Sequence, residues 1–277
     1  MFSTPFTFLK QATAGYDPDA QAFFDAIGAS GGSLTTTEKD AVNGLVLDLK
    51  ADSIWSEING LYPVVGSTAV EHYFNLKDPT AYNVTFQSTD GSWSHSASGA
   101  TASSTNSWIN IISPNTLQGY GLNRALDFSG DGHFSVYYSS PTNAATSYMW
   151  GSSAPDWALI NGYGNTTYYA AFGAGGYATV NNPGRPDGFY INTNNGTTTY
   201  GYRGATQIVT RAETFTPGTS SIDLTLWAVG RSGTPWQGPG PGEQFRGASW
   251  GNYLDATQVA NFDAAMTTFQ TALGRNV

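Results

Sequence analysis

The chain has 277 residues and a net charge of −9, and 11% of its residues are charged and 14% aromatic. Because so few residues are charged, its surface is predicted to be largely neutral and polar, as suits assemblies and sugar ligands. Its acidity and the scattered positions of its Lys and Arg residues argue against nucleic acid as a partner. The lack of cysteine excludes disulfides and thiolate metal sites.

Residues 1–16 are predicted to form an extended arm. Met1–Gln11 has one Lys, which follows the apolar positions, and no apolar run of the length found in secretory signals or membrane spans. We therefore expect no signal peptide and no membrane insertion. Phe2, Phe6 and Phe8 are exposed unless docked, which suits an arm that fastens the protein to a larger particle.

Residues 17–66 carry the signals of a helical segment. Asp17 is a capping carboxylate, Pro18 takes the first helical position, and Gly28 closes the first helix. A capping Thr followed by Glu opens a second helix, in which apolar residues recur at helical spacing. The predicted helices are 17–28, 34–51 and 53–61.

Residues 67–253 are predicted to form an antiparallel β-sandwich. Short stretches rich in Val, Tyr, Thr, Phe and Trp alternate with turns rich in Gly, Asn and Pro, which is typical of two packed sheets. The strongest local signal is Asn195-Gly196, which predicts a type I′ hairpin turn. The predicted strands are 68–74, 93–98, 107–112, 125–128, 133–138, 148–151, 157–160, 168–172, 188–191, 197–202, 207–210, 221–229 and 244–250.

Residues 254–277 are predicted to form a final helix. Asp255 caps its start, Gly274 ends it, and apolar residues between them form one stripe. Such a stripe needs an apolar partner. We therefore expect this helix to pack back on the sandwich or on the first helices.

Two groups of framework segments stand out at the ends of the sequence: 45–50, 54–55, 61–66 and 74–79 near the start, and 254–258, Phe262 and 268–275 near the end. These segments resemble a group of phage virion proteins. The resemblance implies a minor structural or fibre-type virion component, with a concanavalin A-like (laminin G-like) jelly roll between the helical pieces. The matching positions carry no catalytic signature, and the middle of the chain resembles these proteins only in strand rhythm and composition.

Exposed aromatic residues are the candidates for sugar binding, because an aromatic face packs against the C–H face of a pyranose. Trp236 and its neighbour Gln237 lie in a loop, 233–242, that is rich in Gly and Pro and has no hydrophobic period, so a large aromatic is hard to bury there. The alternative is that Trp236 plugs a neighbouring subunit or folds back over the sandwich edge. A weaker candidate surface is formed by Trp150, Trp157, Tyr163 and Tyr168.

One turn has the composition of a weak cation site. Asp127 and Asp131 flank a Gly-containing turn, and calcium favours carboxylate and carbonyl oxygens in such loops. The spacing lacks the pattern of an EF-hand, and an ordinary Asp-Gly hairpin is the competing interpretation. We expect no cofactor beyond this possible Ca²⁺.

The sequence carries no catalytic motif that we recognise. His72, His95 and His133 lack the His-Glu-x-x-His spacing of zinc enzymes, so each is expected to be structural or exposed. None of the five Glu residues lies in the Glu-x-Asp-x-x-Glu pattern of jelly-roll glycoside hydrolases. The prediction is therefore a protein that is not an enzyme, with a glycoside hydrolase as the less favoured alternative.

Taken together, these patterns predict a bacteriophage virion structural protein of the fibre, tail-tip or capsid-decoration type. We expect its location to be the virion and its partners to be other virion proteins, further copies of itself, with a trimer as a plausible assembly, and host-surface polysaccharide. The main alternative is a purely architectural virion protein that binds no glycan.

Overall fold

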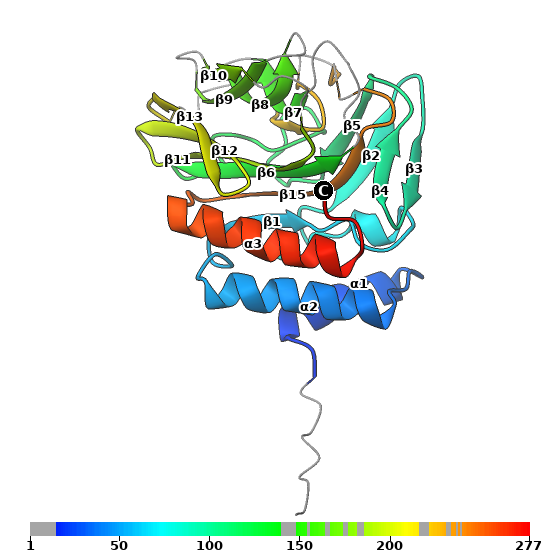
Figure 1. The fold of residues 1–277 in the computed structure, drawn as a ribbon. Helices are drawn as coiled ribbons and strands as arrows, with labels where there is room; N and C mark the ends of the chain where they lie inside the picture. The colour runs from blue at the N-terminus through cyan, green and yellow to red at the C-terminus, as the bar shows by residue number, and fades with distance from the viewer. Residues whose placement is uncertain are drawn as a thin grey trace, which may run out of the picture.

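The computed structural model describes residues 15–139, 148–153, 156–163, 167–173, 177–181, 186–215, 222–230, 234–236, 238 and 240–277. Figure 1 shows three layers: one sheet at the top, a second sheet beneath it, and helices below the second sheet. None of the helices in the described ranges is both long and apolar enough to cross a lipid bilayer.

The sheet next to the helices, called sheet A, has eight strands within the described residues, and all its neighbouring strands are antiparallel. The strand β1 (Ile58–Tyr62) pairs with β15 beside this main order. The order of the others is β13 (Thr206–Ala212), β12 (Thr198–Arg203), β11 (Gly188–Asn194), β6 (Gly132–Ser139), β15 (Gln244–Gly251), β4 (Gly99–Ala102) and β3 (Trp93–Ser96).

The opposite sheet, called sheet B, has seven strands in the part of the chain that is described, again with antiparallel neighbours. Its order is β10 (Ala178–Asn181), β9 (Thr167–Phe172), β8 (Asp156–Tyr163), β7 (Tyr148–Ser153), β14 (Thr225–Leu226), β5 (Ser107–Ile111) and β2 (Val84–Ser88). The predicted fold is confirmed: the chain is a concanavalin A-like antiparallel β-sandwich with helices at both ends.

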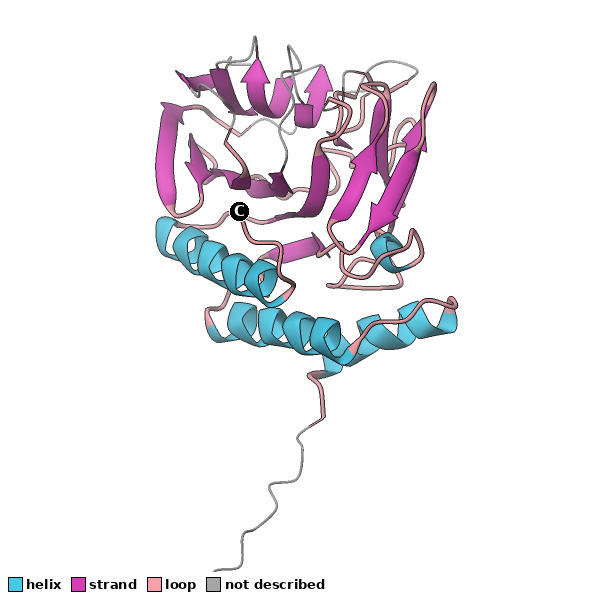
Figure 2. Cartoon of the chain, turned by 45° about the vertical axis from the view of Figure 1, so that its right-hand side comes forward, coloured by secondary structure: helices cyan, strands magenta, loops and turns pink. Residues whose placement is uncertain are grey.

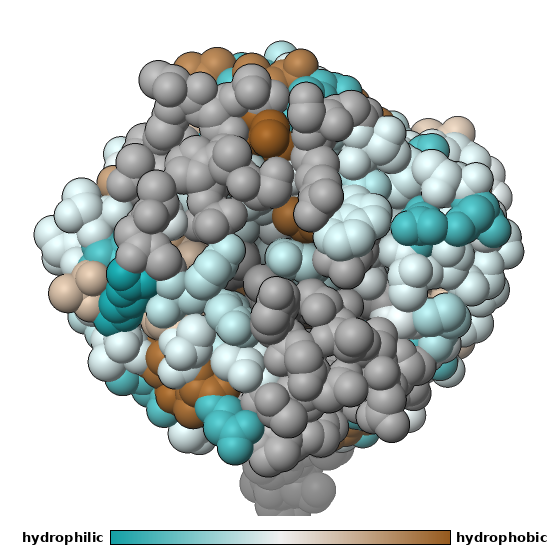
Figure 3. Space-filling view, turned by 90° about the horizontal axis from the view of Figure 1, so that it is seen from above, coloured by the Kyte–Doolittle hydropathy of each residue, from teal (hydrophilic) through white to brown (hydrophobic). Residues whose placement is uncertain are grey.

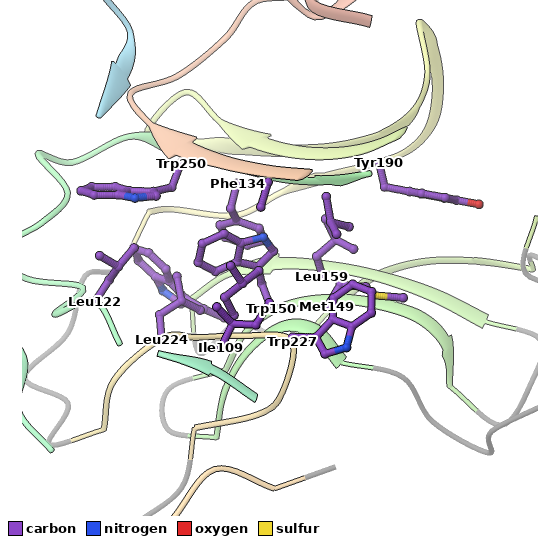
Figure 4. Packing of buried hydrophobic residues seen from close by; sticks show 14 of the residues in the cluster. Ile109, Leu122, Phe134, Met149, Trp150, Leu159, Tyr190, Leu224, Trp227 and Trp250 are labelled. Atoms are coloured by element: carbon purple, nitrogen blue, oxygen red, sulfur yellow. The ribbon is translucent and has the colours of Figure 1, made fainter. Parts of the chain in front are cut away.

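Large aromatic side chains fill the space between the two sheets. Trp150 and Trp227 lie between the sheets, with Phe134 and Trp250 reaching toward them from sheet A (Figure 4). All four side chains are almost completely buried. Because an aromatic side chain buries a large apolar area, this layer supplies much of the hydrophobic stabilisation of the sandwich.

The helix α3 (Ala256–Ala272) lies against the outer face of sheet A (Figure 1). The helices α2 (Thr36–Ala51) and α1 (Pro18–Ala29) lie below it, with α2 packed against α3 and α1 packed against α2. Every residue of β6 and of β11 is buried, so these central strands are covered on both faces. Phe262 of α3 meets Phe189 of β11 edge-to-face, with ring centroids 5.0 Å apart. A second hydrophobic core, separate from the one between the sheets, therefore joins the helices to sheet A.

The helices begin at the predicted capping residues, but the first helix does not end at Gly28, because it continues to Ala29 and is capped by Ser30. The carboxylate of Asp17 accepts a hydrogen bond from the backbone N–H of Asp19 and lies 2.6 Å from Nζ of Lys50. Capping boxes begin the other two helices, formed by Thr35 with Glu38 and by Asp255 with Gln258. These reciprocal bonds satisfy backbone donors that a helix start leaves free.

Two predicted elements near the N-terminal side are wrong. The helix predicted over 53–61 is replaced by β1, which pairs with β15, and a side chain at Gly60 would collide with the indole of Trp250. The strand predicted over 68–74 is instead a short 3₁₀ helix, η1 (Glu71–Tyr73). The Glu71 carboxylate accepts hydrogen bonds from the backbone N–H groups of Ser67 and Thr68, which favours this tight turn over an extended strand.

Other departures from the predicted strands also have local causes. Residues 125–128 form turns because the backbone N–H of Ala125 bonds to the side chain of Asn123, and the N–H of Asn123 bonds to Asp127. Within the described part of the predicted strand 221–229, only 225–226 form a regular strand. The prediction also missed β2, β4 and β10, which have only five, four and four residues.

The hairpin at Asn195-Gly196 is confirmed, but its turn is not type I′. Gly196 has a φ of 94°, whereas Asn195 is not among the described residues with positive φ. The side chain of Asn195 instead accepts hydrogen bonds from the backbone N–H groups of Thr197 and Thr198. This side-chain bonding takes the place of a second left-handed residue.

Arg275 ties the end of α3 to distant parts of the chain. Its buried guanidinium donates hydrogen bonds to the carbonyls of Pro63, Val64 and Ala97 at 2.8–3.1 Å, and to the side chain of Gln270 at 2.7 Å. Burial and the nearby charge of Arg246 lower the pKa of Arg275 to about 9, so it stays charged at neutral pH. One side chain thus joins the end of the helical layer to the segment after β1 and to the turn between β3 and β4.

The variant Arg275→Met is expected to lower the free energy of unfolding by about 3 kcal/mol, because it leaves several buried carbonyls without a donor. Urea unfolding measures this loss. The exposed Arg203→Met is the matched control and should stay near the original stability. Equal stabilities for the two variants would contradict the role given to Arg275.

Stability is expected to fall on acidification between about pH 6.5 and pH 4. His133 is buried, and its ring is hydrogen-bonded with the carbonyl of Asn252 and the hydroxyl of Ser249. Burial lowers the pKa of His133 to about 4. Between these pH values the unfolded chain binds more protons than the folded chain. His133 alone therefore lowers the free energy of unfolding by about 2 kcal/mol when the pH falls from 7 to 5. Unfolding curves at both pH values should show a smaller difference for His133→Gln than for the unaltered protein. Identical differences would contradict this account.

Candidate functional site

An aromatic groove lies where the edges of the two sheets meet. The strand β2 ends sheet B and β3 ends sheet A, and a cavity of about 440 Å³ opens between them. In Figure 2 these edge strands stand on the right, above the short helix η1. The residues that line this cavity, called the edge groove, are Ala69, Tyr73, Val84, Thr85, Phe86, Ser88, Gly91, Ser92, Trp93 and His95.

Three rings form a fixed wall of the edge groove. Phe86 meets Trp93 and His95 edge-to-face, with centroid distances of 5.0 Å and 4.6 Å. The indole N–H of Trp93 donates a 2.8 Å hydrogen bond to the carbonyl of Gln87, so this side chain from sheet A is anchored to the edge of sheet B. The rings are half-buried, and the wall is therefore rigid while part of it faces the groove.

His95 is held by a second histidine behind the wall. The Nδ1 atoms of His72 and His95 are 2.9 Å apart, and Nε2 of His72 lies 3.4 Å from the carbonyl of Gly66. If Nε2 of His72 carries the proton toward Gly66, its Nδ1 must accept from Nδ1–H of His95. Burial, with the nearby charge of His95, lowers the pKa of His72 to about 4, and burial also lowers the pKa of His95. Both rings are therefore neutral at pH 7.

Glu71 fixes the floor beneath the histidine pair. Its carboxylate accepts hydrogen bonds from the backbone N–H groups of Ser67, Thr68 and Ser33. Burial acts to raise the pKa of Glu71, but these donors outweigh it and the pKa is lowered. The carboxylate is thus occupied by backbone donors, and these hydrogen bonds orient the turn that carries His72 and Tyr73.

The chemistry of the edge groove is that of a site for a neutral polar ligand. Among its lining residues in the described chain, His95 is the only ionisable side chain apart from Tyr73. Thr85, Ser88 and Ser92 supply hydroxyl groups beside the aromatic wall. Aromatic faces with a few polar groups are suited to pyranose rings, whose C–H faces are apolar and whose edges carry hydroxyls.

Most of the aromatic residues proposed from the sequence lie elsewhere. Trp150, Trp157 and Tyr168 have no exposed surface, so the prediction that they form a binding surface is wrong. They point into the space between the sheets, because each sits at a core-facing position of its strand. The backbone of Tyr163 ends β8, and its side chain lies outside the described residues.

Trp236 is exposed, as the sequence predicts. Its side chain is 39% exposed, and its backbone forms a bridge to Val229. Gln237 lies outside the described residues. A ligand-binding role for Trp236 stays a prediction, and the residue is not part of the edge groove.

Asp127 has a structural role that the sequence did not predict. Its carboxylate accepts hydrogen bonds from the side chains of Ser113, Asn115 and Tyr82 and from the backbone N–H of Asn123. Asp131 instead accepts from the backbone N–H of Tyr253. No cluster of three or more potential metal-ligating side chains occurs among the described residues. Calcium binding at this turn stays a prediction.

A cavity larger than the edge groove has a less suitable lining. A space of about 520 Å³ separates α3 from β11 and the β12–β13 turn, and it contains Asp187, Arg203 and Asp263. Its floor is Tyr137, whose hydroxyl donates to Asn276 and accepts from the backbone of Val277. This seam joins the helical layer to sheet A, whereas the edge groove brings an aromatic wall to the surface.

The sequence carried a partial signal for the edge groove. Trp93 and His95 alternate along a predicted strand and so share one face, but nothing local shows that Phe86 of an unpredicted strand packs against both. Tyr73 was placed in a strand that does not form. The site depends on contacts between segments that are not neighbours in the chain.

No family model and no curated protein matches this sequence. Among solved structures, a mutant of Trypanosoma rangeli sialidase displaying trans-sialidase activity is similar, with a TM-score of 0.51, 10% identity, and coverage of 82% of this chain and 39% of that chain. Trypanosoma rangeli sialidase in complex with sialic acid gives a TM-score of 0.50 and 10% identity, covering 80% and 38% of the two chains. This chain thus spans well under half of the sialidase chains.

A third similar structure is Domain 4 of AbnA, a GH43 extracellular arabinanase from Geobacillus stearothermophilus, in complex with arabinotriose. Its TM-score is 0.47 at 13% identity, covering 74% of this chain and 98% of that one. At such identities the sialidase likeness shows the fold alone, and the arabinanase likeness is too low to support an argument. The sialidase likeness therefore supports the β-sandwich fold and nothing beyond it.

These comparisons contradict the prediction that the protein is not an enzyme. That prediction drew on the missing Glu-x-Asp-x-x-Glu pattern, which belongs to one group of hydrolases and not to the fold. The solved chains that share the fold are sialidases, and one of them displays trans-sialidase activity. The prediction is therefore withdrawn.

The variant Asp127→Asn is expected to lower the free energy of unfolding by about 2 kcal/mol, because an amide cannot accept every hydrogen bond that the carboxylate accepts. Thermal unfolding should give the same loss in calcium and in a chelator. A stability of the unaltered protein that rises with calcium and falls with the chelator would show instead that Asp127 holds a cation.

Proposed function

We propose that this protein is a bacteriophage virion structural protein, of the fibre, tail-tip or capsid-decoration type, that binds host-surface glycan in the edge groove. The observation that carries the binding part is the anchored wall of Phe86, Trp93 and His95 beside hydroxyl side chains. Glycan recognition needs such a combination, because a sugar presents apolar and hydroxyl surfaces together.

The surface composition supports a neutral partner. Only 11% of the residues are charged, and pale residues predominate among the described residues in the view from the sheet B side (Figure 3). With a net charge of −9, the protein gives no long-range attraction to anionic ligands. Short-range packing and hydrogen bonding in a groove are then the means of recognition.

The virion part of the proposal rests on the resemblance at the two ends of the sequence. Most of those segments belong to α2, α3 and the residues that join them to sheet A. They form the layer opposite sheet B, so the same protein has one side for other virion proteins and an edge for a ligand (Figure 1). Detection of this chain in purified particles by mass spectrometry tests this part, and its absence from them would contradict it.

Weak binding at one groove is compatible with firm attachment of a particle. Exposed hydroxyl recognition contributes little net free energy per site, and several copies on one particle raise the overall avidity by orders of magnitude. The proposal therefore includes a homo-oligomer, such as a trimer. Mass photometry measures the number of copies directly.

A glycan array probed with the purified oligomer tests the binding part of the proposal. We expect binding to neutral glycans, with about a tenfold loss of affinity in Trp93→Ala, because the variant removes the largest ring of the wall. Trp93→Phe keeps a ring without the indole N–H and should lose less. Trp236→Ala, an aromatic residue outside the groove, should bind as before.

Two outcomes of this assay would overturn the proposed site. Binding that survives in Trp93→Ala and disappears in Trp236→Ala would move the site to the loop of Trp236. No binding to any glycan would favour the purely architectural alternative. Circular dichroism and the melting temperature of each variant show whether a loss of binding reflects a loss of folding.

A further inference from the structure

A second cavity continues the edge groove along the same strand. It measures about 320 Å³, and Tyr73 belongs to the lining of both cavities. The first cavity follows β2 from Val84 to Ser88, and the second takes up the chain just before it, at 80–83. The residues that line the second cavity, called the tyrosine pocket, are Tyr73, Thr80, Ala81, Tyr82, Asn83, Ile112, Ser113 and Pro114.

Tyr82 is held in the tyrosine pocket by an uncommon backbone conformation. Its φ is 55°, in the left-handed region that residues other than glycine seldom adopt. Its carbonyl accepts a 2.8 Å hydrogen bond from Tyr62, its hydroxyl donates to Asp127 at 3.2 Å, and its ring meets Trp250 edge-to-face at 5.1 Å. The surrounding structure thus fixes a half-exposed aromatic ring in the tyrosine pocket.

The base of the tyrosine pocket is fixed in the same way. The side chain of Asn83 accepts from the backbone N–H of Asn75 and donates to the carbonyl of Pro79, both at 2.8 Å. Ile112, at the rim, is 48% exposed. The pocket therefore has a rigid polar base, a tyrosine ring and an exposed apolar rim, which is the same mixture of surfaces as in the edge groove.

The two cavities together follow the open edge of sheet B. A five-residue strand such as β2 is about 17 Å long. The tyrosine pocket extends the combined cavity beyond the start of β2. This length exceeds what a single sugar ring can fill. Apart from the histidine and the tyrosines, the lining residues of both cavities in the described chain carry no ionisable side chain.

We infer that the ligand is an internal stretch of a neutral, linear glycan, which occupies subsites on both sides of Tyr73. The inference rests on the proposed function and adds that recognition needs several connected sugar units. One subsite is the wall with Trp93, and the other is the tyrosine pocket with Tyr82 and Ile112. A chain that spans both gains from the second subsite without a second loss of translational freedom.

The test begins with neutral polysaccharides as probes: xylan, mixed-linkage β-glucan, dextran, galactomannan and arabinan. Oligosaccharides of each bound polysaccharide, from the single sugar to the hexasaccharide, are then titrated calorimetrically into the full-length protein. We expect affinity to rise by about tenfold or more between the disaccharide and the hexasaccharide. Equal affinities for these two lengths would overturn the inference while leaving the proposed function in place.

Two variants separate the subsites. Ile112→Arg places a bulky charged side chain at the rim of the tyrosine pocket and should reduce hexasaccharide affinity to near that of the disaccharide, with disaccharide affinity unchanged. Leu47→Arg is the matched control, because Leu47 lies on α2 and is 49% exposed. Trp93→Ala should weaken both lengths. A purely structural effect of Ile112→Arg would weaken both lengths equally, and that result would count against the inference.

Extended peptides are the other occupants that an open strand edge accepts. A set of uncharged peptides is therefore carried through the same titrations. Peptide binding that is lost in Trp93→Ala, without binding of any polysaccharide, would overturn both the inference and the proposed function. Binding of polysaccharide but not of peptide is the expected result.

Discussion

The central strands of sheet A are buried on both faces, and this constraint determines the rest of the architecture. In β6 and β11 every residue is buried, so an uncovered outer face would leave rings such as Tyr137 and Phe189 in water. The helices from both ends of the chain cover that face. The same contacts bury the apolar stripes of the helices. Neither the helices nor this sheet can bury its apolar surface without the other.

This arrangement also explains where a ligand can bind. The outer face of sheet A is closed by helices, and Arg275 bonds the helical layer to the segments at Pro63–Val64 and Ala97. At the opposite end of the sheet order, β3 and β2 have no further neighbour, and the indole of Trp93 links these two edges. The edge groove thus forms where the edge strands of the two sheets meet. Its wall is rigid because Phe86 and Trp93 also pack against the core between the sheets.

The sequence predicted the elements whose signals are local and failed where distant contacts decide. Asp255 with Gln258 marks a helix start by itself, and the prediction was right. The segment around Ile58 has apolar residues at helical spacing, yet its pairing with β15 makes it a strand. Trp150 and Trp157 were assigned to a surface because a strand pattern does not reveal which face is inside. The groove was missed because Tyr73, Phe86 and Trp93 come from three separate elements.

Hydrogen–deuterium exchange with and without a bound neutral oligosaccharide tests most directly whether the edge between the sheets is the binding site. The account predicts slower exchange on binding in 71–75 and 80–96, with the helices and the strands β11–β13 unchanged. Slower exchange confined to α3 and β11–β13 would place the ligand in the seam beneath sheet A and contradict the account.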